Sequence, residues 1–163
     1  MTRQTAFMDA FTGVRPSRQG RRGSTTRQRA DLLSRVPLFS GLSRRHIKQL
    51  AEACSDAHYR AGATIVQEGA PGDTFFVIVE GEAAVLRGVR TIAKLGPGDF
   101  FGEIALLDGG PRTASVQART TVLALRLNRS TFNRMLKIEP KIGVTILDEV
   151  ARRIRQREHL LTA

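Results

Sequence analysis

The spacing of apolar residues changes twice along this 163-residue chain and divides it into three regions. Before residue 57, apolar residues recur every three or four positions, which is the period of a helix with one buried face. From residue 57 to 126, short apolar segments alternate with glycine-rich turns, which indicates β-strands. After residue 130 the helical spacing returns. The expected order is therefore helices, a β-rich region and helices again.

Two helices are expected before the strands and two after them. Pro37 should end the first, over residues 30–36, because proline disfavours helical backbone at the residue that precedes it. Ser43 is a suitable N-cap for the second helix. Beyond the strands, Ser130 is expected to cap the third helix, and Pro140 fits the first turn of the fourth.

Seven short strands are expected in the β-rich region, most of them bounded by glycine. Many short strands at close and even spacing are typical of an antiparallel β-roll, a jelly-roll-like barrel. The expected fold class is therefore mainly β with flanking helices. The strands are expected around Tyr59 and at 64–67, 74–80, 82–87, 91–95, 114–118 and 121–126.

Charge is distributed unevenly along the chain. The formal net charge is +11, and residues 1–30 contain seven arginines and one acidic residue. This segment has too few large apolar side chains to bury a core, so we expect a disordered basic tail at 1–30 and one folded domain at 31–163. Such a tail is suited to weak contact with an anionic surface and not to specific recognition of nucleic acid.

Composition also bears on location and chemistry. The longest apolar run, Phe75–Val79, is much too short to span a bilayer, and the sequence contains no recognisable signal peptide. Cys54 is the only cysteine, which excludes an intrachain disulfide and favours the cytoplasm. The three histidines are scattered, and no nucleophile has an adjacent base. We therefore expect no metal, no cofactor and no enzymatic activity.

The segment from Gly102 to Ala114 reads GEIALLDGGPRTA and contains the groups that a phosphodiester next to a ribose requires. Arg112 supplies a guanidinium, whose fork of N–H donors matches two phosphate oxygens. Glu103 supplies a carboxylate acceptor for a sugar hydroxyl, and Gly102 lets a ligand approach the backbone. The first turn of a helix in this segment would add unpaired N–H donors for the anion.

This segment resembles the phosphate-binding cassette of the cyclic nucleotide-binding domain family, whose pattern is close to F-G-E-x-A-L-(x)n-P-R-x-A. Every position of the pattern is filled, beginning at Phe101, and we call residues 102–114 the cassette. The resemblance extends from about residue 35 to 158. A second segment, residues 68–82, is similar to the family pattern G-x-x-G-D-x-x-F-x-V-x-x-G. In that segment four residues are expected to serve turns and not to contact a ligand: Gly69, Gly72, Asp73 and Gly81.

The resemblance implies a short helix in the cassette and a 3′,5′-cyclic purine nucleotide as the ligand, cAMP in preference to cGMP. It implies that Arg112 neutralises the cyclic phosphate and that Glu103 accepts a hydrogen bond from the ribose 2′-hydroxyl. The hydroxyl of Thr113 can reach either the phosphate or the purine edge. The implied ligand-binding residues are Gly102, Glu103, Ile104, Ala105, Arg112, Thr113 and Ala114, with backbone N–H groups of Ile104 and Ala105 completing the phosphate cradle.

The residues around the base are less well defined. Val85 and Ala93 are expected to flank it, and a residue of the final helix is expected to cover it as a lid. If the ligand contacts that helix only in its closed position, binding shifts the conformational equilibrium toward that position. Three residues remain equal candidates for the lid: Arg153, Ile154 and Arg157.

These expectations describe a regulatory domain that signals to a protein partner or to another copy of itself. Two alternatives share the same fold. One is a protein-interaction adaptor that binds no nucleotide. The other is a relative of transcription regulators that lacks their DNA-binding domain. A helix-turn-helix would have to follow the final helix, and only a few residues follow it here.

Overall fold

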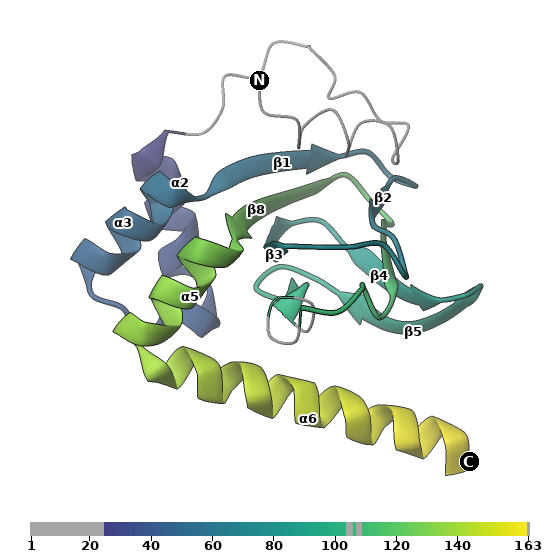
Figure 1. The fold of residues 1–163 in the computed structure, drawn as a ribbon. Helices are drawn as coiled ribbons and strands as arrows, with labels where there is room; N and C mark the ends of the chain where they lie inside the picture. Colours follow the sequence, from purple (N-terminus) through teal and green to yellow (C-terminus); the bar gives the residue numbers. More distant parts are fainter. Residues whose placement is uncertain (1–24, 104–105, 107–108, 163) are drawn as a thin grey trace.

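The computed structural model describes residues 25–103, 106 and 109–162, the side chains of 156–162 excepted. Helices α2 (Thr26–Ser34), η1 (Pro37–Phe39) and α3 (Arg44–Ala53) precede the strands, and α5 (Arg129–Ile138) and α6 (Pro140–Thr162) follow them (Figure 1). The strands are β1 (Ser55–Tyr59), β2 (Thr64–Val66), β3 (Thr74–Glu80), β4 (Ala83–Arg87), β5 (Arg90–Leu95), β6 (Phe100–Phe101), β7 (Ser115–Ala118) and β8 (Val122–Asn128).

The described strands form two four-stranded antiparallel sheets. One has the order β1-β8-β3-β6 and the other β2-β7-β4-β5, and together they form a roll that does not close into a barrel. Val77 of β3 pairs with Leu125 of β8, and Val85 of β4 pairs with Val116 of β7. The expected mainly β fold with flanking helices is confirmed. Strand β6 was not expected, because its two residues are too few to show a periodic pattern.

Strand β3 contributes to two hydrophobic cores at once. Phe75 belongs to the core between the first sheet and the helices, and its ring centroid lies 4.9 Å from that of Phe132 in α5. Phe76 belongs to the core inside the roll and stacks on Phe101 at 4.8 Å. Successive side chains of a strand point to opposite faces. The uninterrupted apolar run in β3 therefore reflects a strand buried on both sides.

The N-caps of α2 and α3 determine where these two helices begin. Helix α2 begins at Thr26, earlier than the expected residue 30, because Thr25 and Gln28 form a capping box in which each side chain accepts the other's backbone N–H. Ser43 caps α3 as expected, since its hydroxyl accepts the N–H of the third helical residue.

The cap of α5 differs from the expected one. Asn128 is the N-cap, and its side-chain oxygen accepts the N–H of Thr131 at 2.8 Å. The expectation of Ser130 was wrong because β8 runs directly into the helix, so the last strand residue occupies the capping position. Pro140 is the first residue of α6, as expected.

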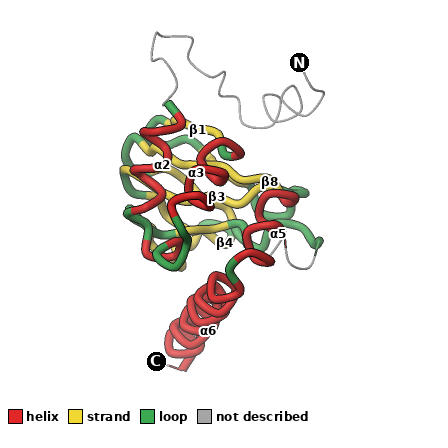
Figure 2. The backbone as a smooth tube through the Cα atoms, turned by 90° about the vertical axis from the view of Figure 1, so that its left-hand side faces the viewer, coloured by secondary structure: helices red, strands yellow, loops and turns green. Residues whose placement is uncertain are grey.

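Helix α6 divides into two halves with different surroundings. Its first half packs through Ile142 and Ile146 into the core shared with the other helices. Leu147, on a neighbouring face, is 63% exposed and does not belong to that core. Beyond this point α6 extends away from α5 and the other helices (Figure 2). The second half is therefore placed to meet the roll instead of the helical core.

Substitutions at Gly62 and Gly81 allow the conformational and the steric cost of an added side chain to be measured separately. Gly81 and Gly62 have φ of +89° and +88°, but a Cβ on Gly81 would lie 2.1 Å from the carbonyl oxygen of Thr121, whereas Gly62 has no atom within 4 Å. Gly62→Ala should cost about 1–2 kcal/mol of left-handed strain. Gly81→Ala should lose at least about 2 kcal/mol more, because the backbone must move. Urea denaturation measures both, and equal losses would contradict the close approach at Gly81.

Candidate ligand-binding site

A cavity of about 310 Å³ lies between the β2-β7-β4-β5 sheet and α6, with the cassette along one side. This volume is at the lower end of the range for sites that hold small organic molecules. The charged side chains of Glu103, Arg112 and Arg153 are at the cassette end, and apolar side chains form most of the remaining wall. The lining residues are Val66, Val85, Arg87, Ile92, Ala93, Phe101, Gly102, Glu103, Arg112, Thr113, Ala114, Val116, Val150, Arg153 and Ile154.

Arg112 is a buried cation held by backbone carbonyl groups. The residue is 7% exposed, and its Nη2 donates to the carbonyl oxygen of Thr74 at 2.9 Å. Nη1 donates to the carbonyl of Gly102 at 3.3 Å, and the guanidinium lies 6.0 Å from the centroid of the Phe76 ring. Burial lowers the pKa of Arg112, and the nearby carboxylates of Asp73 and Glu103 oppose this effect. Each terminal nitrogen retains a second N–H for an anion in the cavity.

Two glycines make room for this guanidinium. A Cβ on Gly72 would lie 2.0 Å from Nε of Arg112, and one on Gly102 would lie 2.6 Å from the carbonyl oxygen of Thr74. Gly69 and Gly81 have positive φ and lie in a turn and a bend, whereas Gly72 has neither a positive φ nor a place in a turn. The turn expectation was therefore wrong for Gly72, whose missing side chain is needed by the cationic end of the site.

Glu103 is a buried acceptor with one oxygen unused. The residue is 2% exposed, and Oε1 accepts a hydrogen bond from Nη1 of Arg153 at 3.1 Å. Oε2 is buried and has no hydrogen-bond partner within the described part of the chain. Burial raises the pKa of Glu103, and the guanidinium of Arg153 opposes that rise. Buried polar atoms of folded proteins almost always have a partner, so Oε2 is an acceptor that a bound molecule could use.

Arg153 joins α6 to the cassette. Besides its contact with Glu103, its Nη2 donates to the carbonyl of Phe100 at 2.7 Å and its Nε donates to Glu149 at 3.2 Å. The guanidinium lies 5.4 Å from the centroid of the Phe100 ring. Val150 and Ile154, on the same side of α6, also line the cavity. The last helix therefore forms one wall of the site.

The structure brings most of the predicted site residues to one cavity. The residues so placed are Gly102, Glu103, Arg112, Thr113, Ala114, Val85, Ala93, Arg153 and Ile154. Ile104 and Ala105 lie outside the described residues, as does the side chain of Arg157. Their predicted roles stay predictions.

Sequence reasoning assigned no ligand role to six lining residues, and three of them carried a usable signal. Arg87 follows Val85 at the two-residue spacing that places strand side chains on one face. Val150 precedes Arg153 by three positions and so shares its helix face. Phe101 stands at the first position of the cassette pattern, next to Gly102. The others, Val66, Ile92 and Val116, reach the cavity through strand pairing that the sequence does not display.

Among the described residues, no group of three or more His, Cys, Asp or Glu side chains could hold a metal ion. Over the same ranges, no helix has both the length and the apolar character needed to cross a bilayer.

Comparison with known proteins identifies the family. Residues 57–139 match the model of the cyclic nucleotide-binding domain. The chain therefore belongs to the cyclic nucleotide-binding domain family. It is 46% identical over 106 residues to the cAMP-dependent protein kinase regulatory subunit of Aspergillus fumigatus, which covers 64% of this chain and 26% of that protein. The chain thus spans about a quarter of the length of the curated relatives it matches.

Solved structures agree with this assignment. The cAMP-bound structure of PfPKA-R superposes with a TM-score of 0.77 at 29% identity, covering 83% of this chain and 47% of that one. The regulatory subunit of a cAMP-independent protein kinase A from Trypanosoma brucei superposes with a TM-score of 0.66 at 27% identity, covering 78% and 48%. Because both share the fold, the ligand has to be argued from the side chains of the cavity.

The raised pKa of Glu103 predicts a pH dependence of stability. Between its ordinary pKa of 4.5 and its raised pKa in the folded chain, this carboxyl is largely deprotonated in the unfolded chain and still largely protonated in the folded chain. Stability falls with rising pH wherever the folded state binds more protons. Urea denaturation at several pH values above 4.5 should therefore show a wild-type stability that falls, relative to Glu103→Gln, as pH rises. Parallel pH profiles for the two proteins would contradict the effect of burial.

Proposed function

We propose that this domain is a cyclic nucleotide sensor that binds a 3′,5′-cyclic purine nucleotide, cAMP in preference to cGMP, and acts as a regulatory and not a catalytic module. The observation that carries the proposal is the pairing of a buried cation with a buried, half-satisfied carboxylate in one cavity. Arg112 has N–H groups to spare, and Glu103 has an oxygen without a donor. The regulatory-subunit relatives and the cAMP-bound neighbour support the same ligand.

Each part of the nucleotide has a matching group in the cavity. The cyclic phosphate carries one negative charge and would lie against Arg112, where low solvent exposure strengthens a charge-assisted hydrogen bond. The ribose 2′-hydroxyl would donate to Oε2 of Glu103 and so satisfy the unpaired atom. The base would lie along the apolar wall that includes Val85 and Ala93. The N–H groups of Ile104 and Ala105 stay the predicted additional donors to the phosphate.

The carboxylate of Glu103 gives the ligand a route to α6. One oxygen is used by Arg153 and the other would be used by the ribose. A bound nucleotide orders Glu103 and adds contacts with Val150 and Ile154, and these contacts exist only while α6 lies against the roll. A ligand shifts a conformational equilibrium by its differential affinity for the two states. Binding therefore favours the closed position of α6.

The output of this movement would be received by a protein partner. The curated relatives are regulatory subunits of a protein kinase, which supports a kinase as one class of partner. Signalling to another copy of the chain is the other class. In both cases the second half of α6, which lines the cavity, would change position with the ligand.

Replacing Arg112 by Ala should weaken cAMP binding by about 2–5 kcal/mol, which is roughly 30-fold or more, because a buried charge-assisted contact is lost. Calorimetric titration with cAMP, cGMP and the non-cyclic 5′-AMP measures the effect. Arg119→Ala is the matched control, since Arg119 is an exposed arginine outside the cavity lining.

Gly72→Ala should weaken binding in the same direction while keeping the charge, because the new Cβ displaces the guanidinium. A loss below about threefold in a folded Arg112→Ala protein would contradict the proposed role of Arg112. Equal affinity of the unchanged protein for cAMP and 5′-AMP would contradict recognition of a cyclic phosphate.

Arg153→Ala should weaken cAMP binding by about tenfold or more, because a hydrogen bond to a charged group typically contributes about 1.5–3 kcal/mol. It should also reduce the effect of cAMP on α6. Hydrogen exchange over residues 141–155 should slow on addition of cAMP in the unchanged protein and slow less in the variant. Arg152→Ala is the control, since Arg152 also pairs with Glu149 but is 66% exposed and absent from the cavity. The same behaviour in both variants would contradict a lid held by Arg153.

A further inference from the structure

Arg153 is shared between two carboxylates, one at the cassette and one on its own helix. Its Nη1 donates to Oε1 of Glu103 at 3.1 Å, and its Nε donates to Oε1 of Glu149 at 3.2 Å. Glu149 lies about one turn earlier on α6 and is not among the residues that line the cavity. It therefore contacts the residue that holds the lid without contacting the space that a nucleotide would occupy.

We propose that Glu149 competes with Glu103 for the guanidinium of Arg153 and so limits how strongly α6 closes over the nucleotide. The proposal rests on the proposed function, because it concerns the same lid and the same ligand. In this role Glu149 makes the domain bind less tightly than its cavity alone would allow, and it lets α6 return more readily to the open position.

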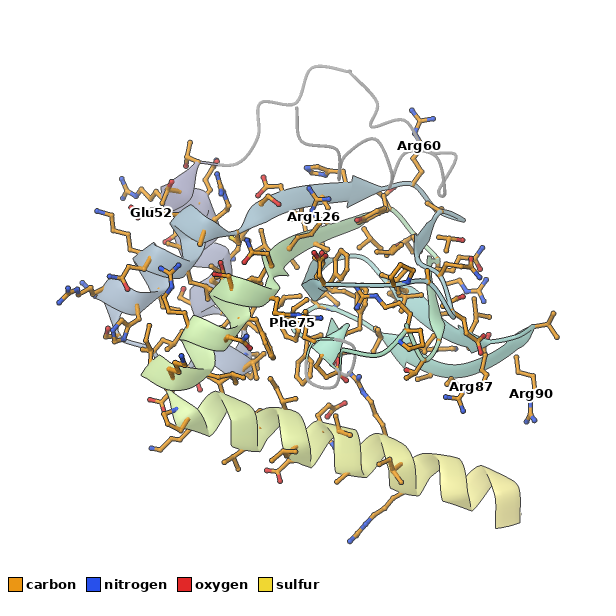
Figure 3. The ribbon with its side chains drawn as sticks, viewed as in Figure 1. Glu52, Arg60, Phe75, Arg87, Arg90 and Arg126 are labelled. Atoms are coloured by element: carbon orange, nitrogen blue, oxygen red, sulfur yellow. The ribbon has the colours of Figure 1, made fainter. Side chains whose placement is uncertain are left out.

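The contacts of Arg153 respond differently when α6 moves. The hydrogen bonds to Glu103 and to the carbonyl oxygen of Phe100 join α6 to the roll, so both break when the helix moves away. In Figure 3, side chains extend from α6 toward the roll, and contacts across this boundary are the ones that opening breaks. The pair with Glu149 joins residues four apart on one helix, where side chains are neighbours, so it moves with the helix. Arg153 thus keeps a charged partner in the open position, which reduces the advantage of closing.

In the closed position the two carboxylates repel each other. Both pair with the same guanidinium, and the side chains of Glu103 and Glu149 are only 3% and 21% exposed, so water screens their charges less than at an open surface. Burial raises the pKa of Glu103, and the negative charge of Glu149 raises it further. A carboxyl that is harder to ionise is a poorer partner for a guanidinium. Glu149 therefore weakens the ion pair between α6 and the cassette.

The second oxygen of Glu149 is also used within α6. Oε2 pairs with Nη2 of Arg152, whose side chain is 66% exposed. An ion pair this exposed contributes little energy. Over the part of the chain that the structure describes, both ion-pair partners of Glu149 belong to α6, so these pairs do not tie the carboxylate to the roll. Glu149 can therefore accompany Arg153 through the whole movement of the helix.

Glu149→Gln tests the charge alone, because the amide oxygen can still accept the N–H of Arg153. The apparent affinity of a ligand rises with the fraction of molecules already in the binding-competent position. The substitution should therefore tighten cAMP binding by about two- to fivefold, the size expected of partly exposed charge pairs. Calorimetric titration measures this change. Without any ligand, hydrogen exchange over residues 141–155 should also be slower in the variant, because the closed position is more populated.

Asp148→Asn is the matched control, since it removes an exposed carboxylate from the adjacent position of α6. The gain from Glu149→Gln should disappear in a Glu103→Gln background, because the competition requires both carboxylates. An equal gain in Asp148→Asn would show that losing any negative charge on α6 favours an anionic ligand, and it would overturn the proposal.

Unchanged or weaker binding in a folded Glu149→Gln protein would also overturn the proposal, and weaker binding would show that Glu149 only orients Arg153. Exchange in the ligand-free protein tests Glu149 independently of any nucleotide. Failure of the unchanged protein to bind a cyclic nucleotide would therefore contradict the proposed function alone, so the two failures are distinguishable.

Discussion

The rest of the site depends on the burial of one positive charge. A guanidinium that is almost fully removed from water has to be surrounded by acceptors, or its desolvation would destabilise the fold. Arg112 meets this requirement through the carbonyl groups of Thr74 and Gly102, which belong to β3 and to the start of the cassette. The side chain is further restricted by the backbone of Gly72. Strand pairing of β3 with β6 is what brings these separate segments around a single charge.

The carboxylate beside it links binding to the rest of the molecule. Glu103 is buried at the cassette, yet its bound partner is a side chain of α6, fifty residues later in the chain. The same helix is attached to the helical core through Ile142 and Ile146. Helix α6 therefore belongs to two structures at once, with its first half in the helical core and its second half at the cavity. A change at the carboxylate therefore acts on the second half of a helix whose first half is held in the helical core.

The residues to which sequence reasoning gave definite roles are those that are close together in the sequence. The cassette places Gly102, Glu103 and Arg112 within a short segment, so their shared chemistry was readable without a structure. The strands were predicted because their glycine turns and apolar segments alternate regularly. The choice between lid residues was not possible, because it depends on which face of α6 meets the roll. Arg153 and Ile154 both line the cavity, but only Arg153 makes the ion pair with the cassette.

The role of Gly72 has a consequence for recognising related proteins. It lies outside the cassette, and its backbone closely approaches the Arg112 side chain. Comparing cassettes alone would class two sequences as equivalent when one of them has a bulkier residue at this position. Such a sequence would keep the arginine but could not hold it in this place without backbone rearrangement. A glycine at position 72 is therefore a useful second criterion, alongside the arginine itself, for separating family members that retain a working anion site from those that retain only its signature.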